Sequence, residues 1–315
     1  MFRMISLSCL LTLLFACSSG NDVEPAVTAT VIVEEVGELI LVTGVTGKQG
    51  GAVARALLDD GYQVRGLTRN ANSERALIMQ TLGVELVTGD FENTASLDIA
   101  MKDVYGVFVV TNFWEHGYEA EVRQGKNAVD AALAAGVAQL IFSSVIHSDL
   151  KTGIAHFQSK YEIEKYILSK DIPYTIFRPV SFMENWEYVR ASIVAGKINS
   201  PFSLATRMQQ ISVIDIGRFV ALAFNKPEDW LARTFDIASE EYTMKQVVNL
   251  FSVVTASPVE FVKTPWDVHE REQGEEMTVM DRWINTEGYN ANINMARMEL
   301  PDMLTLEEYL LQAGW

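Results

Sequence analysis

Residues 39–51 read LILVTGVTGKQGG, and the fold of the chain follows from this stretch. The apolar run at 39–42 predicts a short buried strand. The residues that follow predict an amphipathic helix at 52–58 and a second strand at 63–68. In this order, glycines let the backbone approach a pyrophosphate, and the helix N-terminus supplies free N–H groups. The stretch therefore predicts a dinucleotide-binding loop made of Gly44, Thr46, Gly47, Lys48, Gln49 and Gly50.

The spacing of these glycines is Gly44-x-x-Gly47-x-x-Gly50, which departs from the common G-x-G-x-x-G pattern. A glycine triplet alone is weak evidence, because a tight turn that binds nothing can have the same sequence. The position of the triplet, between the first strand and the first helix of the fold, favours the nucleotide loop over the empty turn.

Apolar strand-like runs alternate with helical patterns beyond the loop, at 84–87, 104–111, 139–143 and 174–177. A long helix is expected at 120–135. Such alternation is typical of βαβ units. We therefore predict an α/β fold, a Rossmann-type doubly wound parallel sheet with a smaller C-terminal α/β substrate lobe. The predicted limits are 37–178 and 209–237 for the Rossmann domain, and 179–208 and 238–315 for the lobe.

The end of the second strand predicts which nucleotide binds. An NAD site usually carries an acidic residue there to hold the ribose hydroxyls, but residues 67–70 read LTRN and contain no acid. Arg69 would instead meet the 2′-phosphate of NADP. A charge-assisted contact contributes roughly 1.5–3 kcal/mol, a preference of about tenfold to a hundredfold. The cofactor prediction is therefore NADP(H), with a solvated surface arginine as the alternative.

Polar residues follow the other strands at the edge of the sheet where ligands of this fold bind. Asp90 is predicted either to accept from the adenine amino group or to cap the next helix, a role that Asn93 could also fill. The floor and wall of the nicotinamide site are predicted to be Thr111, Asn112, Phe113 and Ser143.

The composition of the 315 residues is that of a globular protein, with 49% hydrophobic and 21% charged residues. There are 25 Lys and Arg against 41 Asp and Glu, a formal net charge of −16. Nucleic acids are bound through cations that contact phosphates, and no basic cluster is visible, so nucleic-acid binding is not expected. The only cysteines are Cys9 and Cys17, and the four histidines lack metal-ligand spacing, so no metal site is expected.

Residues 1–17 read MFRMISLSCLLTLLFAC. Arg3 precedes an apolar run of 12 residues at 5–16, which is shorter than the roughly 20 residues of a membrane-spanning helix. A positive residue followed by a short apolar run indicates a signal peptide. We therefore expect the protein to be exported.

The end of this segment resembles a bacterial lipoprotein signal, in which a small residue precedes a lipidated cysteine. Cys17 is the predicted lipidation site, although Phe15 is larger than usual for its position. Residues 18–36 would be a tether, and the lipid would be the only contact with a membrane, on the periplasmic side. The alternatives are an ordinary signal peptide and a true start near Val36, which would make the protein cytoplasmic.

Several further motifs occur in order along the chain. They are VRGLTRN (64–70), VTGDFEN (87–93), GVFVVTNFWE (106–115), QGKNAVDAALAAGV (124–137), HFQSKYEIEKYI (156–167), FRPVSFMENW (177–186), ISVIDIGRFVA (211–221) and RWINTEGYNANI (282–293). Together with the glycine loop they resemble the NmrA-like family, an atypical branch of the short-chain dehydrogenase/reductase superfamily. The resemblance implies a Rossmann domain, NADP(H) binding and a lobe over the substrate cleft. Relatives include both reductases and nucleotide sensors that bind regulatory proteins.

Short-chain reductases generally use Tyr-x-x-x-Lys, and Tyr161 and Lys165 fit that spacing. The preceding stretch fits the superfamily better, because a serine commonly precedes its lysine. In that register Lys160 keeps the lysine role, and His156 replaces the tyrosine. We predict Lys160 and His156 as the catalytic pair, since a histidine has an ordinary pKa near 6.5. The alternative is that Lys160 only bonds the nicotinamide ribose and His156 only caps a helix.

Two functions follow from these features. The first is an NADPH-dependent reductase of a small quinone- or carbonyl-type substrate, with the proton supplied by Lys160, His156 or water. The second is an NADP(H) sensor or scaffold that binds a regulatory protein, which the loss of the superfamily tyrosine favours. Export conflicts with both, because NADP(H) should be scarce outside the cytoplasm and occupancy follows free concentration.

Overall fold

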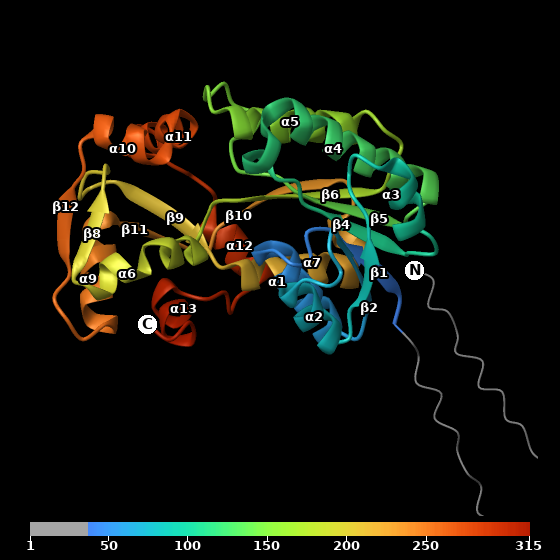
Figure 1. Ribbon diagram of the computed structural model, residues 1–315, viewed down its shortest axis with the longest axis horizontal. Helices are drawn as coiled ribbons and strands as arrows, with labels where there is room; N and C mark the ends of the chain where they lie inside the picture. Colours follow the sequence, from blue (N-terminus) through green and yellow to red (C-terminus); the bar gives the residue numbers. More distant parts are fainter. Residues whose placement is uncertain (1–36) are drawn as a thin grey trace, which may run out of the picture. The chain divides into compact units, whose positions relative to one another are not determined.

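The computed structural model describes residues 37–315 (Figure 1). Val36–Trp315 forms one compact unit. The predicted signal peptide, Cys17 and the tether lie outside the described residues. Among residues 37–315, no helix has the length and apolar composition needed to cross a membrane.

A seven-stranded parallel sheet forms the centre of this unit, in the order β10-β6-β5-β4-β1-β2-β3. Its strands are β1 (Leu39–Val42), β2 (Gln63–Thr68), β3 (Glu85–Thr88), β4 (Gly106–Val109), β5 (Gln139–Ser143), β6 (Tyr174–Pro179) and β10 (Arg233–Ile237). The strand order reverses beside β1, between β1 and β4. In doubly wound sheets, ligands bind outside the carboxyl ends of the strands at this point. The predicted fold class is confirmed.

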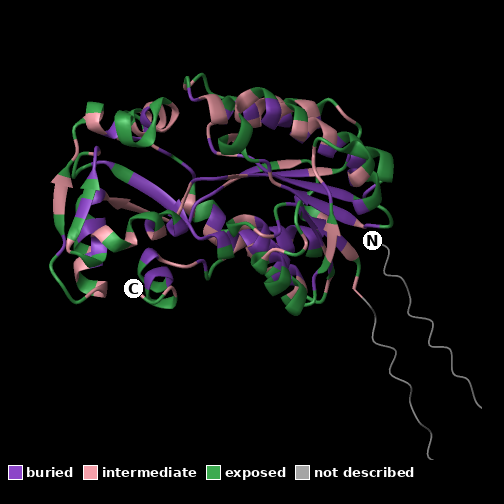
Figure 2. Ribbon diagram, viewed as in Figure 1, coloured by how far each residue is buried: buried purple, intermediate pink, exposed green. Residues whose placement is uncertain are grey.

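Helices cover both faces of the sheet, as Figure 1 shows. One face carries α1 (Lys48–Asp59), α2 (Glu74–Thr81) and α7 (Val213–Asn225), and the other carries α3 (Thr94–Ala100), α4 (Phe113–Ala135) and α5 (Ala155–Leu168). Side chains of a strand alternate between faces. Accordingly, Ile40 and Val42 join the apolar cluster of the first face, and Leu41 joins that of the second. Both faces of the sheet are therefore buried (Figure 2).

Several predicted boundaries were wrong at the edge where ligands bind. Helix α1 begins at Lys48 instead of residue 52, so half of the glycine loop belongs to its first turn. Helix α4 begins at Phe113 instead of residue 120, because Asn112 caps it by accepting from the N–H of Trp114 at 3.2 Å. The helix is interrupted at Gly117, whose φ is 76°. Both helices therefore begin inside segments whose composition suggested loops.

Two small sheets and a set of helices follow the Rossmann core. The sheets are β11-β9-β7 and β12-β8, built from β7 (Ser181–Phe182), β8 (Lys197–Ser200), β9 (Arg207–Ile211), β11 (Glu240–Thr243) and β12 (Glu260–Lys263). The helices are η1 (Met183–Val189), α6 (Arg190–Val194), α8 (Pro227–Trp230), α9 (Met244–Val254), α10 (Trp266–Gln273), α11 (Glu275–Thr286), α12 (Ile293–Glu299) and α13 (Leu306–Gln312). The predicted limit between residues 208 and 209 falls inside β9, so it does not mark a linker.

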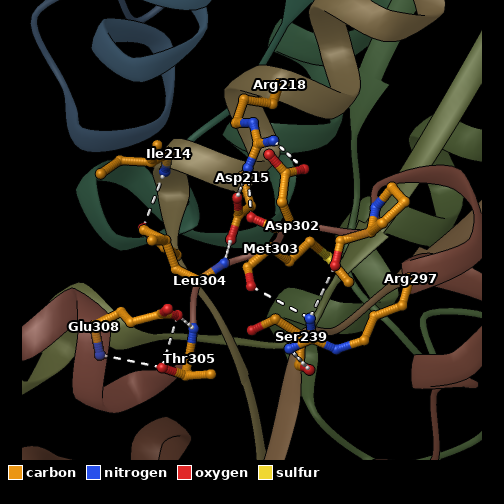
Figure 3. Close-up of polar contacts among 12 residues, drawn as sticks. Ile214, Asp215, Arg218, Ser239, Arg297, Asp302, Met303, Leu304, Thr305 and Glu308 are labelled. Carbon is orange, nitrogen blue, oxygen red and sulfur yellow. Dashed lines mark hydrogen bonds and ion pairs between the residues drawn. The ribbon is translucent and has the colours of Figure 1, made fainter.

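The C-terminal segment is tied to the Rossmann helix α7 by a charged cluster (Figure 3). The Asp215 carboxylate accepts from the N–H of Leu304 at 2.8 Å and pairs with Arg218 at 2.9 Å. Arg218 also donates to the carbonyl of Asp302 at 3.0 Å. Asp215 is fully buried, and such a carboxylate is stable only when it is paired and hydrogen-bonded. These contacts hold the segment that leads into α13 against α7.

Candidate functional site

A cleft of about 1410 Å³ opens at the carboxyl ends of β1, β2 and β4 and continues beneath α10 and α11. Ligand sites in proteins typically measure about 300–1,000 Å³, so this cleft has room for a dinucleotide and a second, smaller molecule. Its walls include all but one of the predicted site residues in the described part of the chain: Gly44, Thr46, Gly47, Lys48, Gln49, Gly50, Arg69, Asp90, Thr111, Asn112, Phe113, His156 and Lys160.

The glycine loop has the shape that a phosphate needs. Gly44 lies at φ +61°, in the left-handed region that glycine tolerates best. A Cβ at Gly50 would lie 2.3 Å from the carbonyl oxygen of Gly44, so only glycine fits there. Gly47, which precedes α1, makes no side-chain cap. The first turn of α1 therefore faces the cleft with its positive end uncapped, as anion sites of this kind require.

Ser143 is the predicted residue that does not line the cleft. It is buried, and its hydroxyl donates to Oε1 of Gln49 at 2.6 Å. Ser144 lines the cleft in its place. The prediction of Ser143 as a wall residue was wrong by one position, because the strand ends at Ser143 and the chain then turns towards the cleft. Ser143 instead fixes a side chain of the glycine loop.

Lys48 reaches across the cleft to the segment after β7. Its Nζ donates to the carbonyl of Glu184 at 2.8 Å and lies 4.0 Å from the ring centre of Tyr188. Glu184 in turn accepts from the N–H of Val213 at 3.1 Å, at the start of α7. Lys48 thus connects the glycine loop with η1.

Arg69 lies at the end of β2, as predicted, and is engaged by a partner that the sequence did not reveal. Its guanidinium pairs with both oxygens of Glu115, at 2.7 and 2.8 Å. The Arg69 hydrogen bond lowers the pKa of Glu115. Both side chains are exposed, at 59% and 41%, so a ligand phosphate can reach Arg69. Ser73 and Arg75 also line this end of the cleft.

The two alternatives for Asp90 are separated by the geometry. The cap of α3 is Asn93, whose side chain accepts from the N–H of Ser96 at 3.2 Å. Asp90 accepts from the N–H of Glu92 at 2.8 Å and borders the cleft. Its carboxylate therefore borders the cleft without being the helix cap, and the contact with adenine stays a prediction.

Lys160 lies at the inner end of the cleft, where Thr111 ends the loop after β4. Its ammonium donates to the carbonyl and the hydroxyl of Thr111, at 3.0 and 2.8 Å, and pairs with Glu121 at 3.0 Å. Glu121 is fully buried and also accepts from Ser159. Burial acts to raise the pKa of Glu121, but Lys160 and the two hydroxyls outweigh burial and lower it. Glu121 is thus an ionised carboxylate that fixes the lysine.

His156 occupies the first turn of α5 among aromatic rings. The ring centre lies 5.0 Å from that of Trp114 and 5.7 Å from that of Phe113. Its backbone N–H and its Nδ1 both contact Oε1 of Glu276, at 2.9 and 2.5 Å. The alternative that His156 caps the helix was wrong, because the cap position of α5 is Ile154 and His156 lies inside the first turn. Burial lowers the pKa of His156, and Glu276 only partly opposes this.

The competing Tyr-x-x-x-Lys motif lies elsewhere on α5. Lys165 is exposed and pairs with Glu162 at 2.7 Å. Neither Tyr161 nor Lys165 borders the cleft, whereas Lys160 does. The register that assigns the lysine role to Lys160 therefore agrees with the geometry.

Comparison with known proteins agrees with this architecture. The NmrA-like family model matches residues 37–310. An NmrA-like family domain-containing oxidoreductase from Malbranchea aurantiaca is 30% identical over 259 residues, 71% of this chain and 75% of that protein.

Solved structures share the fold at low sequence identity. The Citrobacter sp. triphenylmethane reductase complexed with NADP(H) has a TM-score of 0.77 at 19% identity, covering 88% of this chain and 99% of that one. The negative transcriptional regulator NmrA in complex with NADP has a TM-score of 0.71 at 20% identity, covering 88% and 95%. With the family model spanning nearly all of the described residues, the chain belongs to the NmrA-like family.

Proposed function

We propose that the protein binds NADP(H) and acts as an NADPH-dependent reductase of a small apolar substrate of the quinone or carbonyl type. The observation that carries this proposal is Lys160, a charged lysine fixed by Thr111 and Glu121 in the same cleft as an uncapped glycine loop. A family relative is named as an oxidoreductase, and a structural neighbour is a reductase complexed with NADP(H).

The described residues fit the cofactor along the length of the cleft. The glycine loop would hold the pyrophosphate, because side chains are excluded at Gly50 and the end of α1 is uncapped. Arg69 would pair with the 2′-phosphate and Asp90 would lie near the adenine. At the other end, Lys160 would bond the nicotinamide ribose. NADPH, when bound, supplies the hydride for reduction.

The chain's own residues have separate tasks in this proposal. Glu121 and Thr111 take up the donors of Lys160, so the lysine is held in place to orient what binds beside it. His156, with its lowered pKa, would be mostly neutral at pH 7 and would take up a proton from solvent, with its Nδ1 held by Glu276. Phe113 and Trp114 pack against His156 and give this end of the cleft an aromatic wall. The proton for the substrate is thus assigned to His156 or to water.

The test is calorimetric titration of the protein with NADPH and NADH, with Arg69→Ala in parallel. We expect NADPH to bind more tightly than NADH, and the variant to lose about tenfold to a hundredfold in NADPH affinity with NADH unchanged. A quinone panel with NADPH should then show one NADPH oxidised for each substrate reduced. Failure of the wild-type protein to bind either nucleotide would refute the proposal.

A second function is favoured by the state of the catalytic pair. The donors of Lys160 are satisfied within the protein, and His156, which takes the place of the superfamily tyrosine, is bound to Glu276. A structural neighbour, NmrA, is a negative transcriptional regulator. An NADP(H) sensor or scaffold with a protein partner would bind NADPH tightly and oxidise none of it with any member of the quinone panel.

For the location of the protein we propose export with lipidation at Cys17. The support is the sequence of residues 1–17 alone. Labelling of a bacterial host with palmitate should mark the wild-type protein, while Cys17→Ala should remain unlabelled and leave the membrane fraction. An unlabelled wild-type protein in the cytoplasmic fraction would refute export and remove the conflict with NADP(H).

A further inference from the structure

A second pair of titratable side chains lines the cleft, at the end covered by α10 and α11. Nε2 of His269 on α10 lies 2.8 Å from Oδ2 of Asp281 on α11. Both side chains are nearly buried, with 11% and 13% exposed, and both border the cleft. This pair belongs to neither the glycine loop nor the Lys160 cluster.

The surroundings of the pair are apolar. Met277, Met280, Asp281 and Ile284 all line the cleft, and their spacing of three and four residues places them on one face of α11. Asp281 is the only charged residue of that stripe. A buried charge is costly unless it has a partner, and the only partner of Asp281 among residues 37–315 is His269. Burial outweighs the histidine and raises the pKa of Asp281 to about 6.

The geometry leaves one atom of each side chain without a partner among residues 37–315, Nδ1 of His269 and Oδ1 of Asp281, because the bond joins Nε2 to Oδ2. Neither atom is fully buried, so both are open to a small molecule in the cleft that the two residues line. A polar atom without a partner, on an apolar wall of a cleft, is an arrangement typical of ligand sites.

We infer that His269, held by Asp281, binds an oxygen atom on the apolar ring of the substrate. Nδ1 accepts from a ring hydroxyl when this nitrogen carries no proton, and it donates to a ring carbonyl when it carries one. Met277, Met280 and Ile284 contact the ring. This inference rests on the proposed function for its substrate class. It assigns to α10 and α11 the preference for substrates whose ring carries an oxygen atom. The other titratable groups lining this end are Glu272 and Tyr289.

The test uses two probes with the same ring system, menadione, which carries two ring oxygens, and 2-methylnaphthalene, which carries none. Each is titrated calorimetrically into the purified protein with and without saturating NADP⁺, which fills the cofactor half and cannot reduce the quinone. We expect menadione to bind more tightly. Loss of one hydrogen bond in His269→Gln should reduce the affinity for menadione by roughly threefold to tenfold and leave 2-methylnaphthalene unchanged.

Two substitutions at the same position separate binding from structure. Gln places its amide near the position of Nε2 and keeps the contact with Asp281, whereas Asn places its amide near Nδ1. The inference therefore predicts that His269→Asn keeps more of the preference for menadione than His269→Gln. If the pair has only a structural role, His269→Gln should keep more of the preference for menadione than His269→Asn. That order, or an equal loss of affinity for both probes, would overturn the inference. His147→Asn, a half-buried histidine outside the cleft lining, is the matched control.

Asp281→Asn tests the inference independently, through the melting temperature and the preference for menadione. Because the pKa of this carboxyl is raised in the folded protein, its ionised form costs stability as the pH rises above the unfolded value. At pH 7.5 the melting temperature of Asp281→Asn should equal or exceed that of the wild type, while the preference for menadione falls. A lower melting temperature with the preference intact would show a structural pair. Because the probes are also titrated without NADP⁺, failure of NADP⁺ to bind would refute the proposed cofactor and leave this result readable.

Discussion

Two ion pairs lie at opposite ends of the same cleft and differ in how much water reaches them. Arg69 and Glu115 are exposed at 59% and 41%, whereas Lys160 and Glu121 are exposed at 12% and 0%. An exposed pair contributes only about 0–1 kcal/mol, so a ligand can exchange one partner at little cost. Removing one partner of a buried pair costs about 3–5 kcal/mol, because the other charge stays buried. The first pair is suited to exchange with a phosphate, and the second to holding a group still.

The largest effect should follow from breaking the buried pair at its carboxylate. Glu121→Ala leaves the Lys160 ammonium without its charged partner, at a cost of about 3–5 kcal/mol. For a chain of this size that corresponds to a fall in melting temperature of roughly 6–20 °C. NADPH oxidation should fall with it, because Lys160 is no longer fixed. Thermal unfolding and steady-state rates measure both effects.

The control for this variant is Glu119→Ala, an exposed glutamate of the same helix. Glu121→Gln keeps the size and hydrogen-bonding capacity of the side chain but removes its charge, and it should fall between the two. If Glu121→Ala has the same melting temperature as Glu119→Ala, the buried pair does not stabilise the cleft, and the contrast between the two pairs is lost.

A second prediction concerns the pH dependence of the buried pair. The pKa of Glu121 is lowered in the folded protein, so its contribution is present above the unfolded value and is lost as the pH falls through the folded one. Removing Lys160 leaves burial dominant and raises that pKa, which reverses the sign. Lys160→Met should therefore lose more stability between pH 5 and pH 8 than the wild type does.

Lys165→Met is the matched control, because Lys165 lies on the same helix and is exposed. Melting curves at pH 5, 6.5 and 8 distinguish the three proteins. A Lys160→Met variant that keeps the pH profile of the wild type would mean that the two hydroxyls alone hold Glu121 ionised.

The same contrast explains how much of the site the sequence predicted. The alternation of strands and helices depends on residues close together in the chain, and the fold class was predicted correctly. The glycine loop and Lys160 line one cleft, and their roles in binding and catalysis stay predictions. The carboxylates that engage the site were missed, because each meets a partner far along the chain. Glu115 is 46 residues from Arg69, and Glu276 is 120 residues from His156.

Composition gave no sign of which of the 41 acidic residues would face the cleft. Glu121 is the partial exception, since it is a charged residue on a helix face otherwise made of small side chains such as Ala128 and Ala132. An acid on an apolar helix face is the signal that could have found both Glu121 and Asp281. A search for that pattern needs the helix faces to be known first, and the start of α4 was predicted seven residues too late.

The smallest effect should come from releasing the exposed pair. Glu115→Gln frees Arg69 from a competitor that the 2′-phosphate must otherwise displace, and because such a pair contributes at most about 1 kcal/mol, NADPH affinity should rise by no more than about fivefold. NADH affinity should not change. In the Arg69→Ala background the same substitution should have no effect, since the competition requires the arginine. Calorimetry of the wild type, the two single variants and the double variant gives this double-mutant cycle. If Glu115→Gln binds NADPH more weakly than the wild type, Glu115 itself holds the cofactor. The exposed pair would then be part of the binding site and would not compete with the phosphate.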